Sequence, residues 1–285
     1  MSLGNNKPTR SEQRDAARAK ARDMREQHKK GEKRKRVAIQ ASIAAVVVGI
    51  IAIIGFAIVS GGDKVVAEPT NMTFNDGIKI GANLEAFTST STPTPTTSPA
   101  PAEVPNIVVY IDYQCPICQA FEVPNKSQIE SWVSSGAATL ELHPISFLDG
   151  RGSPNEYSSR AANATVCVAE YSPAQVFKFN SILFENQPEE GTAGPDNKEL
   201  IARTVEVGVT NADKVASCIS SKDFGTWVAD ATDRALGQKI PGTDFQVDGT
   251  PFILVNGKQY TWETGEDLVS PARFAQFVQS VSAQG

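Results

Sequence analysis

The sequence predicts an α/β domain with an inserted helical domain, preceded by one transmembrane helix. Three observations support this prediction. Residues 37–59 form a long uncharged apolar stretch, and short β-rich runs lie on either side of a helical region at about residues 155–239. A Cys-Pro-Ile-Cys motif directly follows the first of these runs, so the predicted sheet and the predicted chemistry belong to one domain.

The apolar stretch has the properties of a membrane anchor. Its 23 residues, 37–59, are long enough as a helix to span a bilayer core of roughly 30 Å. A cleaved signal peptide is the alternative, but the stretch and the 36 residues before it are both too long for one. We therefore expect an uncleaved single-pass anchor in the cell membrane.

Charge sets the expected orientation. Residues 1–36 carry 13 Lys or Arg and 5 Asp or Glu, although the whole chain has a net charge of −5. Under the positive-inside rule, this tail is cytoplasmic and the rest of the chain after the anchor is extracytoplasmic. The tail has no aromatic residue, which favours contact with anionic lipid headgroups over nucleic acid.

Residues 60–105 are expected to connect the anchor to the domain. Within residues 71–80, Asn75-Asp76-Gly77 lies between apolar runs and predicts a hairpin turn. Residues 88–105 contain 14 Thr, Ser or Pro in 18 positions, a composition that cannot bury a core. This part of the chain is therefore predicted to be a short hairpin, which adds to the edge of the domain that follows, and an extended linker.

The first elements of the domain surround the cysteine motif. Residues 106–113 (NIVVYIDY) are β-branched and aromatic and predict a buried strand. Apolar residues at helical spacing predict a helix over residues 119–134 with a kink at Pro124, and residues 138–147 predict a second strand.

The rest of the domain, which we expect to span residues 106–285, is helical before a final hairpin. Residues 250–255 and 259–262 are β-rich and are joined by Asn256-Gly257, a strong hairpin signal. Residues 271–282 predict a closing amphipathic helix. Between residues 155 and 239, the pattern predicts five helices: 158–169, 173–186, 197–207, 211–219 and 224–236.

The Cys-Pro-Ile-Cys motif predicts a redox-active dithiol. At a helix N-terminus, unpaired N–H groups and the helix dipole stabilise an anion, so Cys115 is expected to have a lowered pKa. Pro116 suits the first helical turn, and Cys118, one turn further, is expected to be the shielded resolving thiol. The alternatives are a purely structural short-range disulfide and half of a zinc site.

A zinc site needs four ligands at matching spacing. Apart from the motif, only Cys167, Cys218 and His143 are candidates, and they stand singly and far apart in the sequence. We therefore predict no metal. Cys167 and Cys218, 51 residues apart, are expected to form a structural disulfide worth about 4 kcal/mol, with two free buried thiols as the alternative.

Two stretches carry a family resemblance. Residues 112–122 (DYQCPICQAFE), together with residues 247–257 (VDGTPFILVNG), resemble the DsbA-like branch of the thioredoxin superfamily. The likeness covers roughly residues 106–284, and the tail and single anchor resemble the membrane-anchored actinobacterial type. The resemblance implies a thioredoxin fold with an inserted helical domain.

The resemblance also implies roles for individual residues. Thr250-Pro251 would form a cis peptide bond beside the dithiol and bind a substrate strand, together with Pro116 and Ile117 of the motif. Glu122 would be a partly buried acid that assists proton transfer, although alone it reads as a solvated helix carboxylate. Strongly oxidising members often carry His where this chain has Ile117, so the oxidising strength stays open.

The sequence thus predicts a thiol-disulfide oxidoreductase that introduces disulfide bonds into exported proteins with free thiols. No cofactor is expected. The family implies reoxidation by a membrane quinone-linked thiol oxidase of the DsbB or VKOR (vitamin-K-epoxide-reductase) type. A reductase or isomerase of the same fold is the nearest alternative, and a non-catalytic peptide-binding or chaperone module is the alternative from another class.

Overall fold

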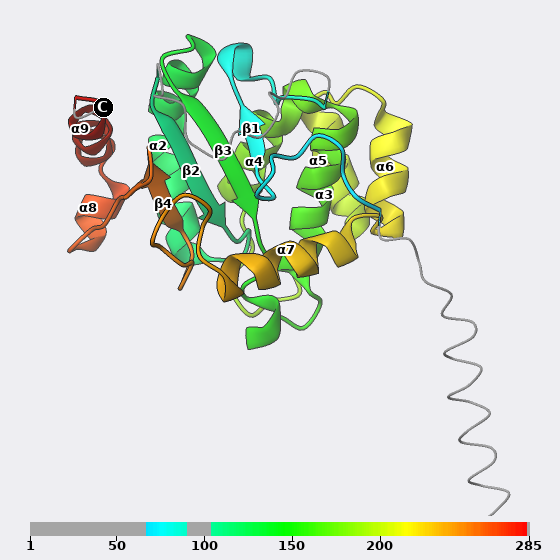
Figure 1. Ribbon diagram of the computed structural model, residues 1–285. Coiled ribbons are helices and arrows are strands. Elements are labelled where there is room, and N and C mark those ends of the chain that lie inside the picture. Colours follow the sequence, from blue (N-terminus) through cyan, green and yellow to red (C-terminus); the bar gives the residue numbers. More distant parts are fainter. Residues whose placement is uncertain (1–66, 90–103, 284–285) are drawn as a thin grey trace, which may run out of the picture. The chain divides into compact units, whose positions relative to one another are not determined.

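The computed structural model describes residues 67–89 and 104–283 (Figure 1). The expected cytoplasmic tail, the expected anchor at residues 37–59 and most of the predicted linker lie outside these residues. Among the helices of the described ranges, none combines the length and the apolar character that crossing a bilayer requires.

A five-stranded mixed sheet forms the centre of the described domain, in the order β1-β3-β2-β4-β5. β2 (Asn106–Ile111) and β3 (Thr139–Pro144) run parallel. β1 (Ile78–Ile80) pairs antiparallel with β3, and β4 (Phe252–Val255) pairs antiparallel with β2. β5 (Lys258–Gln259) completes the other edge. The central strands are rich in Val, Ile and Leu because both of their faces are covered.

The helices outside the insertion pack against one another, and α2 (Pro116–Ser134) also contacts β3. α2 begins at the cysteine motif and contains Pro124. α8 (Gly265–Val269) and α9 (Pro271–Ser282) follow the hairpin and pack against α2, and Figure 1 shows them beyond β4. Phe121 of α2 and Phe274 of α9 meet edge to face, with ring centroids 5.1 Å apart. This contact fixes the helix that carries the motif against the end of the chain.

The inserted helical domain is present where the sequence predicts it. In Figure 1, α3, α5 and α6 gather on the β1 side of the sheet, opposite α8 and α9. All five predicted helices are confirmed, with ends shifted by a few residues: α3 (Tyr157–Tyr171), α4 (Val176–Glu185), α5 (Asn197–Glu206), α6 (Ala212–Ser221) and α7 (Gly225–Gly237).

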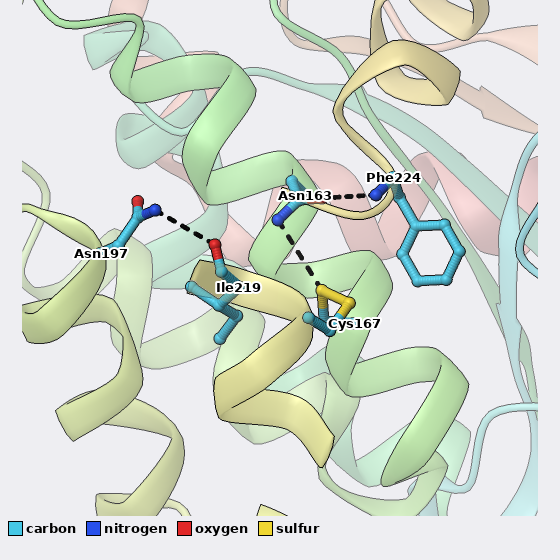
Figure 2. Close-up of a disulfide and its surroundings, with 6 residues drawn as sticks. Asn163, Cys167, Asn197, Ile219 and Phe224 are labelled. Carbon is cyan, nitrogen blue, oxygen red and sulfur yellow. Dashed lines mark hydrogen bonds between the residues drawn. A yellow bond between two sulfur atoms is a disulfide. The ribbon is translucent and has the colours of Figure 1, made fainter. Parts of the chain in front are cut away.

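A disulfide joins Cys167 of α3 to Cys218 of α6, the pairing favoured from the sequence (Figure 2). Both cysteines are buried, and Asn163 lies beside them. Its Nδ2 lies 3.7 Å from Cys167 Sγ, and its Oδ1 accepts a hydrogen bond from the Phe224 backbone N–H at 2.9 Å. The disulfide therefore lies buried where α3, α6 and the start of α7 pack together, a position that suits a structural role.

The predicted hairpin at residues 71–80 is wrong in its pairing. The turn forms, with the Asp76 N–H donating to Thr73 O at 3.1 Å, but within the described residues only the segment after it is a strand. That strand, β1, pairs with β3 instead of with the residues before the turn. The addition expected at the edge of the domain is therefore a single strand, β1, instead of a hairpin.

Smaller differences concern element ends. α2 begins three residues before the predicted helix, so the whole Pro-Ile-Cys part of the motif is helical. In the C-terminal hairpin, Asn256-Gly257 makes the turn with positive φ at both residues, as its sequence favours, but β5 is only two residues long. α8 was not predicted, although Thr264 and Asp267 form the capping box that begins it.

Candidate active site

The two cysteines of the motif occupy different environments. Cys115 is the N-cap of α2, and Pro116 is its first helical residue. The structure holds both cysteines as thiols; Cys115 is 7% exposed, whereas Cys118 has no exposed surface. Ile117 between them is 46% exposed. Only the first sulfur is thus within reach of a group arriving from solvent.

Hydrogen bonds to Cys115 stabilise its thiolate. The Cys118 thiol hydrogen-bonds to the Cys115 sulfur, and the backbone N–H groups of Ile117 and Cys118 add to it, so that the pKa of Cys115 falls to about 6 despite burial. Burial and the adjacent Cys115 sulfur raise the pKa of Cys118 well above its ordinary value. Near neutral pH, one thiolate and one thiol therefore share a proton at the start of α2.

Thr250 and Pro251 lie beside this pair. Their peptide bond is cis, and Cys115 Sγ lies 3.2 Å from the Thr250 carbonyl oxygen, to which it donates when it is protonated. The Thr250 side chain is close enough to the sulfurs to help to lower the pKa of Cys115. A polypeptide that reaches Cys115 would therefore meet the backbone of Thr250 and the exposed Ile117 side chain.

The loop between α4 and α5 forms a second wall, which the sequence did not reveal. Gln187 donates from Nε2 to the Cys115 carbonyl oxygen at 2.9 Å. Gln114 donates from Nε2 to the carbonyl oxygens of Glu189 and Thr192 at 3.1 and 2.8 Å. These contacts join residues about 70 positions apart in the chain, so the inserted helical domain holds the motif in place.

Asp112 directly follows β2 and helps to hold the residues of the cysteine motif in position. Its carboxylate is fully buried and accepts from the Gln114 N–H at 2.8 Å, the Ser158 hydroxyl at 2.6 Å and the Leu148 N–H at 2.8 Å. Its own backbone N–H points at Cys118 Sγ, 3.5 Å away. Burial raises the pKa of Asp112 to about 6. Asp112 belongs to residues 112–122, the stretch that carries the family resemblance, but neither periodicity nor spacing in the sequence indicated a role for it.

Glu122 lies one turn after Cys118 and is half-buried. Burial raises the pKa of Glu122 to about 7, against a hydrogen bond from Asn180 Nδ2 to Glu122 Oε2 at 3.0 Å. Asn180 Oδ1 in turn accepts from the Tyr113 hydroxyl at 3.0 Å. The Tyr113 hydroxyl interacts electrostatically with both Glu122 and Cys118. The predicted acid is therefore linked to the region of the buried sulfur through Asn180 and Tyr113.

This arrangement suits thiol-disulfide exchange. A disulfide between Cys115 and Cys118 would present the Cys115 sulfur to an attacking thiolate, because Cys118 is shielded. The lowered pKa of Cys115 makes it a good leaving group when the exchange is completed. In the described ranges, no group of three His, Cys, Asp or Glu side chains is placed to hold a metal ion.

Comparison with known proteins identifies the family. The model of the thioredoxin family matches residues 99–278, which is more than half of the chain. The chain belongs to the thioredoxin family. The predicted family resemblance is thus confirmed, and the fold is a mixed α/β thioredoxin-like fold with a helical insertion.

Solved structures of thiol-disulfide oxidoreductases resemble the chain. A disulfide bond oxidoreductase (DsbG) from Mycobacterium tuberculosis, in reduced form, is 29% identical with a TM-score of 0.54 and covers 72% of this chain and 87% of its own. Oxidised DsbA from the same organism is also 29% identical, with a TM-score of 0.52 and coverage of 73% and 99%. MdbA from Actinomyces oris, a thiol-disulfide oxidoreductase, shares the fold at 22% identity, a TM-score of 0.54 and coverage of 74% and 91%.

A curated relative has a different overall make-up. The serine/threonine-protein kinase PknE of Mycobacterium tuberculosis is 26% identical over 196 residues, which cover 66% of this chain and 31% of the kinase. This chain thus spans about a third of the length of the curated relative it matches.

Proposed function

We propose that this protein is a thiol-disulfide oxidoreductase that introduces disulfide bonds into exported proteins. The observation that carries the proposal is the asymmetry of the motif: Cys115 is slightly exposed with a pKa of about 6, and Cys118 is fully buried with a raised pKa. The resemblance to DsbG and DsbA of Mycobacterium tuberculosis supports the same reaction class.

The proposed reaction begins with the Cys115–Cys118 disulfide. A substrate thiolate attacks Cys115 Sγ, the disulfide breaks, and Cys118 leaves as a thiolate that takes up a proton. A second substrate thiolate then attacks the substrate sulfur of the mixed disulfide, and Cys115 leaves as a thiolate. The substrate has lost two electrons, and the protein has gained them as a dithiol.

The stabilised thiolate supports the oxidase direction of exchange. Any interaction that lowers the pKa of Cys115 at neutral pH stabilises the dithiol form, which makes the disulfide form a stronger oxidant. Strongly oxidising relatives would use His in place of Ile117, whereas here the hydrogen bond from Cys118 and the backbone N–H groups supply the stabilisation. This supports the oxidase direction without the His.

The proposed setting of the reaction rests on the sequence. Residues 37–59 would anchor the protein in the cell membrane, with the catalytic domain extracytoplasmic, where disulfides persist. Each turnover leaves a dithiol, so a reoxidant is required. We propose a membrane quinone-linked thiol oxidase of the DsbB or VKOR type for this step.

The test uses the full-length chain, reconstituted in lipid nanodiscs and oxidised beforehand. It is mixed with a reduced, unfolded protein whose native state contains disulfides, and the loss of substrate thiols is followed. We expect one disulfide formed for each chain without added oxidant, and none with Cys115→Ser. Failure of the oxidised wild type to remove substrate thiols would refute the proposal.

A reductase or isomerase is the second candidate, because Ile117 departs from the strongly oxidising pattern. The same nanodisc preparation, reduced beforehand and mixed with a protein that contains non-native disulfides, distinguishes the candidates. Faster rearrangement or reduction than oxidation would favour this second function. Full activity of Cys115→Ser in cells would instead favour a non-catalytic peptide-binding or chaperone role.

A further inference from the structure

Asp112 is a buried carboxylate that has no direct part in the proposed exchange reaction. It has no exposed surface and directly follows β2. Its carboxylate accepts from the Gln114 and Leu148 backbone N–H groups at 2.8 Å and from the Ser158 hydroxyl at 2.6 Å. These donors belong to the residue before Cys115, to the turn after β3 and to α3. The carboxylate is therefore fixed where the cysteine motif meets the insertion.

The charge of this carboxylate has no cationic partner. The salt bridges within residues 67–89 and 104–283 join other groups, and none of them involves Asp112. Ionising a buried carboxylate without a cation is unfavourable, and the three hydrogen bonds offset only part of this cost. The titratable groups that face Asp112 are themselves neutral or anionic: Cys115 and Cys118 of α2, Tyr157 of α3, and Asp149, which accepts from the Ser158 N–H.

Asp112 also lies against the two thiols of the motif. The Cys115 N–H donates to the Asp112 carbonyl oxygen at 3.1 Å, and the Asp112 N–H points at Cys118 Sγ, 3.5 Å away. Burial is the main cause that raises the pKa of Asp112 to about 6, and the charge of Cys115 adds to this rise. An electrostatic interaction acts equally on both partners, so the Asp112 carboxylate opposes the formation of the Cys115 thiolate.

We propose that the charge of Asp112 opposes the Cys115 thiolate, so that reduction of the disulfide draws a proton onto the Asp112 carboxylate. Asp112 acts through Cys115 and does not touch the substrate, so it is a positioning residue. The inference rests on the proposed function, because it concerns the proton balance of that exchange.

The protons and electrons of a turnover then balance within the site. Two substrate thiols lose two electrons and two protons when they become a disulfide, and the electrons reduce the Cys115–Cys118 bond. One proton goes to Cys118 and the other to Asp112, while Cys115 stays a thiolate. The Ser158 hydroxyl, which donates to the carboxylate, accepts from the neutral acid. At a pH well above 6, the second proton goes to solvent instead, and the two negative charges repel each other.

The experiment measures the equilibrium of the Cys115–Cys118 pair with glutathione, in the full-length chain in nanodiscs, from pH 5 to 8. Samples are quenched with acid, and free thiols are counted after reaction with a mass-adding alkylating reagent. Asp112→Asn removes the charge but keeps the backbone N–H beside Cys118 and a side-chain oxygen for Gln114 and Ser158.

We expect the equilibrium of Asp112→Asn to favour the dithiol by about threefold or more at pH 7 to 8, because nothing then opposes the thiolate. The difference should narrow as the pH falls below about 6, where the wild-type carboxylate is neutral as well. A purely structural contact would not show this dependence on pH.

Two further variants separate the charge from its surroundings. Glu141→Gln is the matched control, because Glu141 is also a buried carboxylate but lies on β3, beside Gly77 and the Thr73 hydroxyl. It should leave the equilibrium unchanged at every pH. Ser158→Ala removes one donor, so Asp112 keeps its proton to a higher pH. It should favour the dithiol near pH 6 and match the wild type at pH 8.

The proposal is overturned if Asp112→Asn leaves the equilibrium unchanged, or if it shifts the equilibrium equally at pH 5 and pH 8. Where Asp112→Asn fails to fold, Ser158→Ala decides the matter, and the absence of a shift near pH 6 overturns the proposal. Failure of the proposed oxidase function appears separately, as the lack of substrate thiol loss in the oxidation assay, and leaves this pH-dependent difference intact.

Discussion

The two cysteine pairs of this protein have the same chemical groups but differ in their surroundings and in their bonding. Cys167 and Cys218 are 51 residues apart, are both buried, and join α3 to α6 of the insertion as a disulfide. Cys115 and Cys118 are three residues apart at a helix N-terminus and are held as thiols. Only the second pair has hydrogen bonds that stabilise a thiolate and an edge that faces solvent. Position in the fold, rather than residue type, thus decides which pair can exchange.

The largest expected effect breaks the reactive pair. Cys115→Ser removes the accessible sulfur, and we expect the rate of substrate oxidation to fall at least about a thousandfold. Cys118→Ser keeps the accessible sulfur but cannot resolve, so it should accumulate mixed disulfides with substrate proteins. Both outcomes are read by non-reducing electrophoresis and thiol titration. Mixed disulfides formed equally well through Cys167 or Cys218 would contradict the comparison.

The next effect breaks the structural pair. Replacing both Cys167 and Cys218 by Ala releases a loop of 51 residues, which should lower the free energy of unfolding by about 4 kcal/mol. Denaturant unfolding of the full-length chain measures it. The matched control, Cys115→Ser with Cys118→Ser, removes as many cysteines, but these two are only three residues apart and close no long loop. Its free energy of unfolding should therefore change far less. Equal losses of stability would show that the two pairs are not distinct in role.

A third variant sharpens the account of the thiolate. Because the hydrogen bond from Cys118 is the main cause of the low pKa of Cys115, Cys118→Ala should raise this pKa from about 6 towards 9.0, by at least about one unit. The rate of alkylation of Cys115 against pH in the reduced protein gives the midpoint. Cys167→Ala with Cys218→Ala should leave that midpoint unchanged, and a shift there would mean that the insertion tunes the thiolate.

The smallest effect concerns the acid beside the reactive pair. Burial raises the pKa of Glu122 from 4.5 to about 7, so the folded state favours the neutral carboxyl. Its stabilising contribution is complete below about pH 4.5 and is lost as the pH rises through about 7. Glu122→Gln should therefore remove a stability loss on the order of 2 kcal/mol between pH 5 and 8. Denaturant unfolding of both proteins in the oxidised form measures it, and identical pH profiles would contradict the account.

Local signals predicted most of the fold. The helices of the insertion were found because their apolar residues recur at helical spacing, and Asn256-Gly257 gave the C-terminal turn. The predicted pairing of residues 71–80 was wrong because the partner of β1 is β3, which lies about 60 residues further along the chain. The order of apolar and polar residues within a segment does not indicate which distant strand the segment pairs with. The fit of Gly77 against Glu141 belongs to the same distant contact.

The candidate site divides in the same way. The cysteines lie within four consecutive residues, and Thr250-Pro251 precedes a recognisable strand, so the sequence exposes both. Asp112, Gln114 and Gln187 act through contacts with Ser158, Thr192 and the Cys115 backbone, which only folding brings together. Residues that hold a motif in position thus remain hidden in a sequence that shows the motif itself.

The redox state of Cys115 and Cys118 in growing cells tests the central claim most directly. Intact cells are quenched with acid, free thiols are trapped with a mass-adding alkylating reagent, and the full-length chain is resolved by electrophoresis, with the Cys167→Ala and Cys218→Ala variant as a check that only the reactive pair is counted. The account predicts that the Cys115–Cys118 pair is mostly disulfide, ready to oxidise a substrate. A pair found mostly as dithiol would contradict the oxidase and support a reductase or isomerase instead.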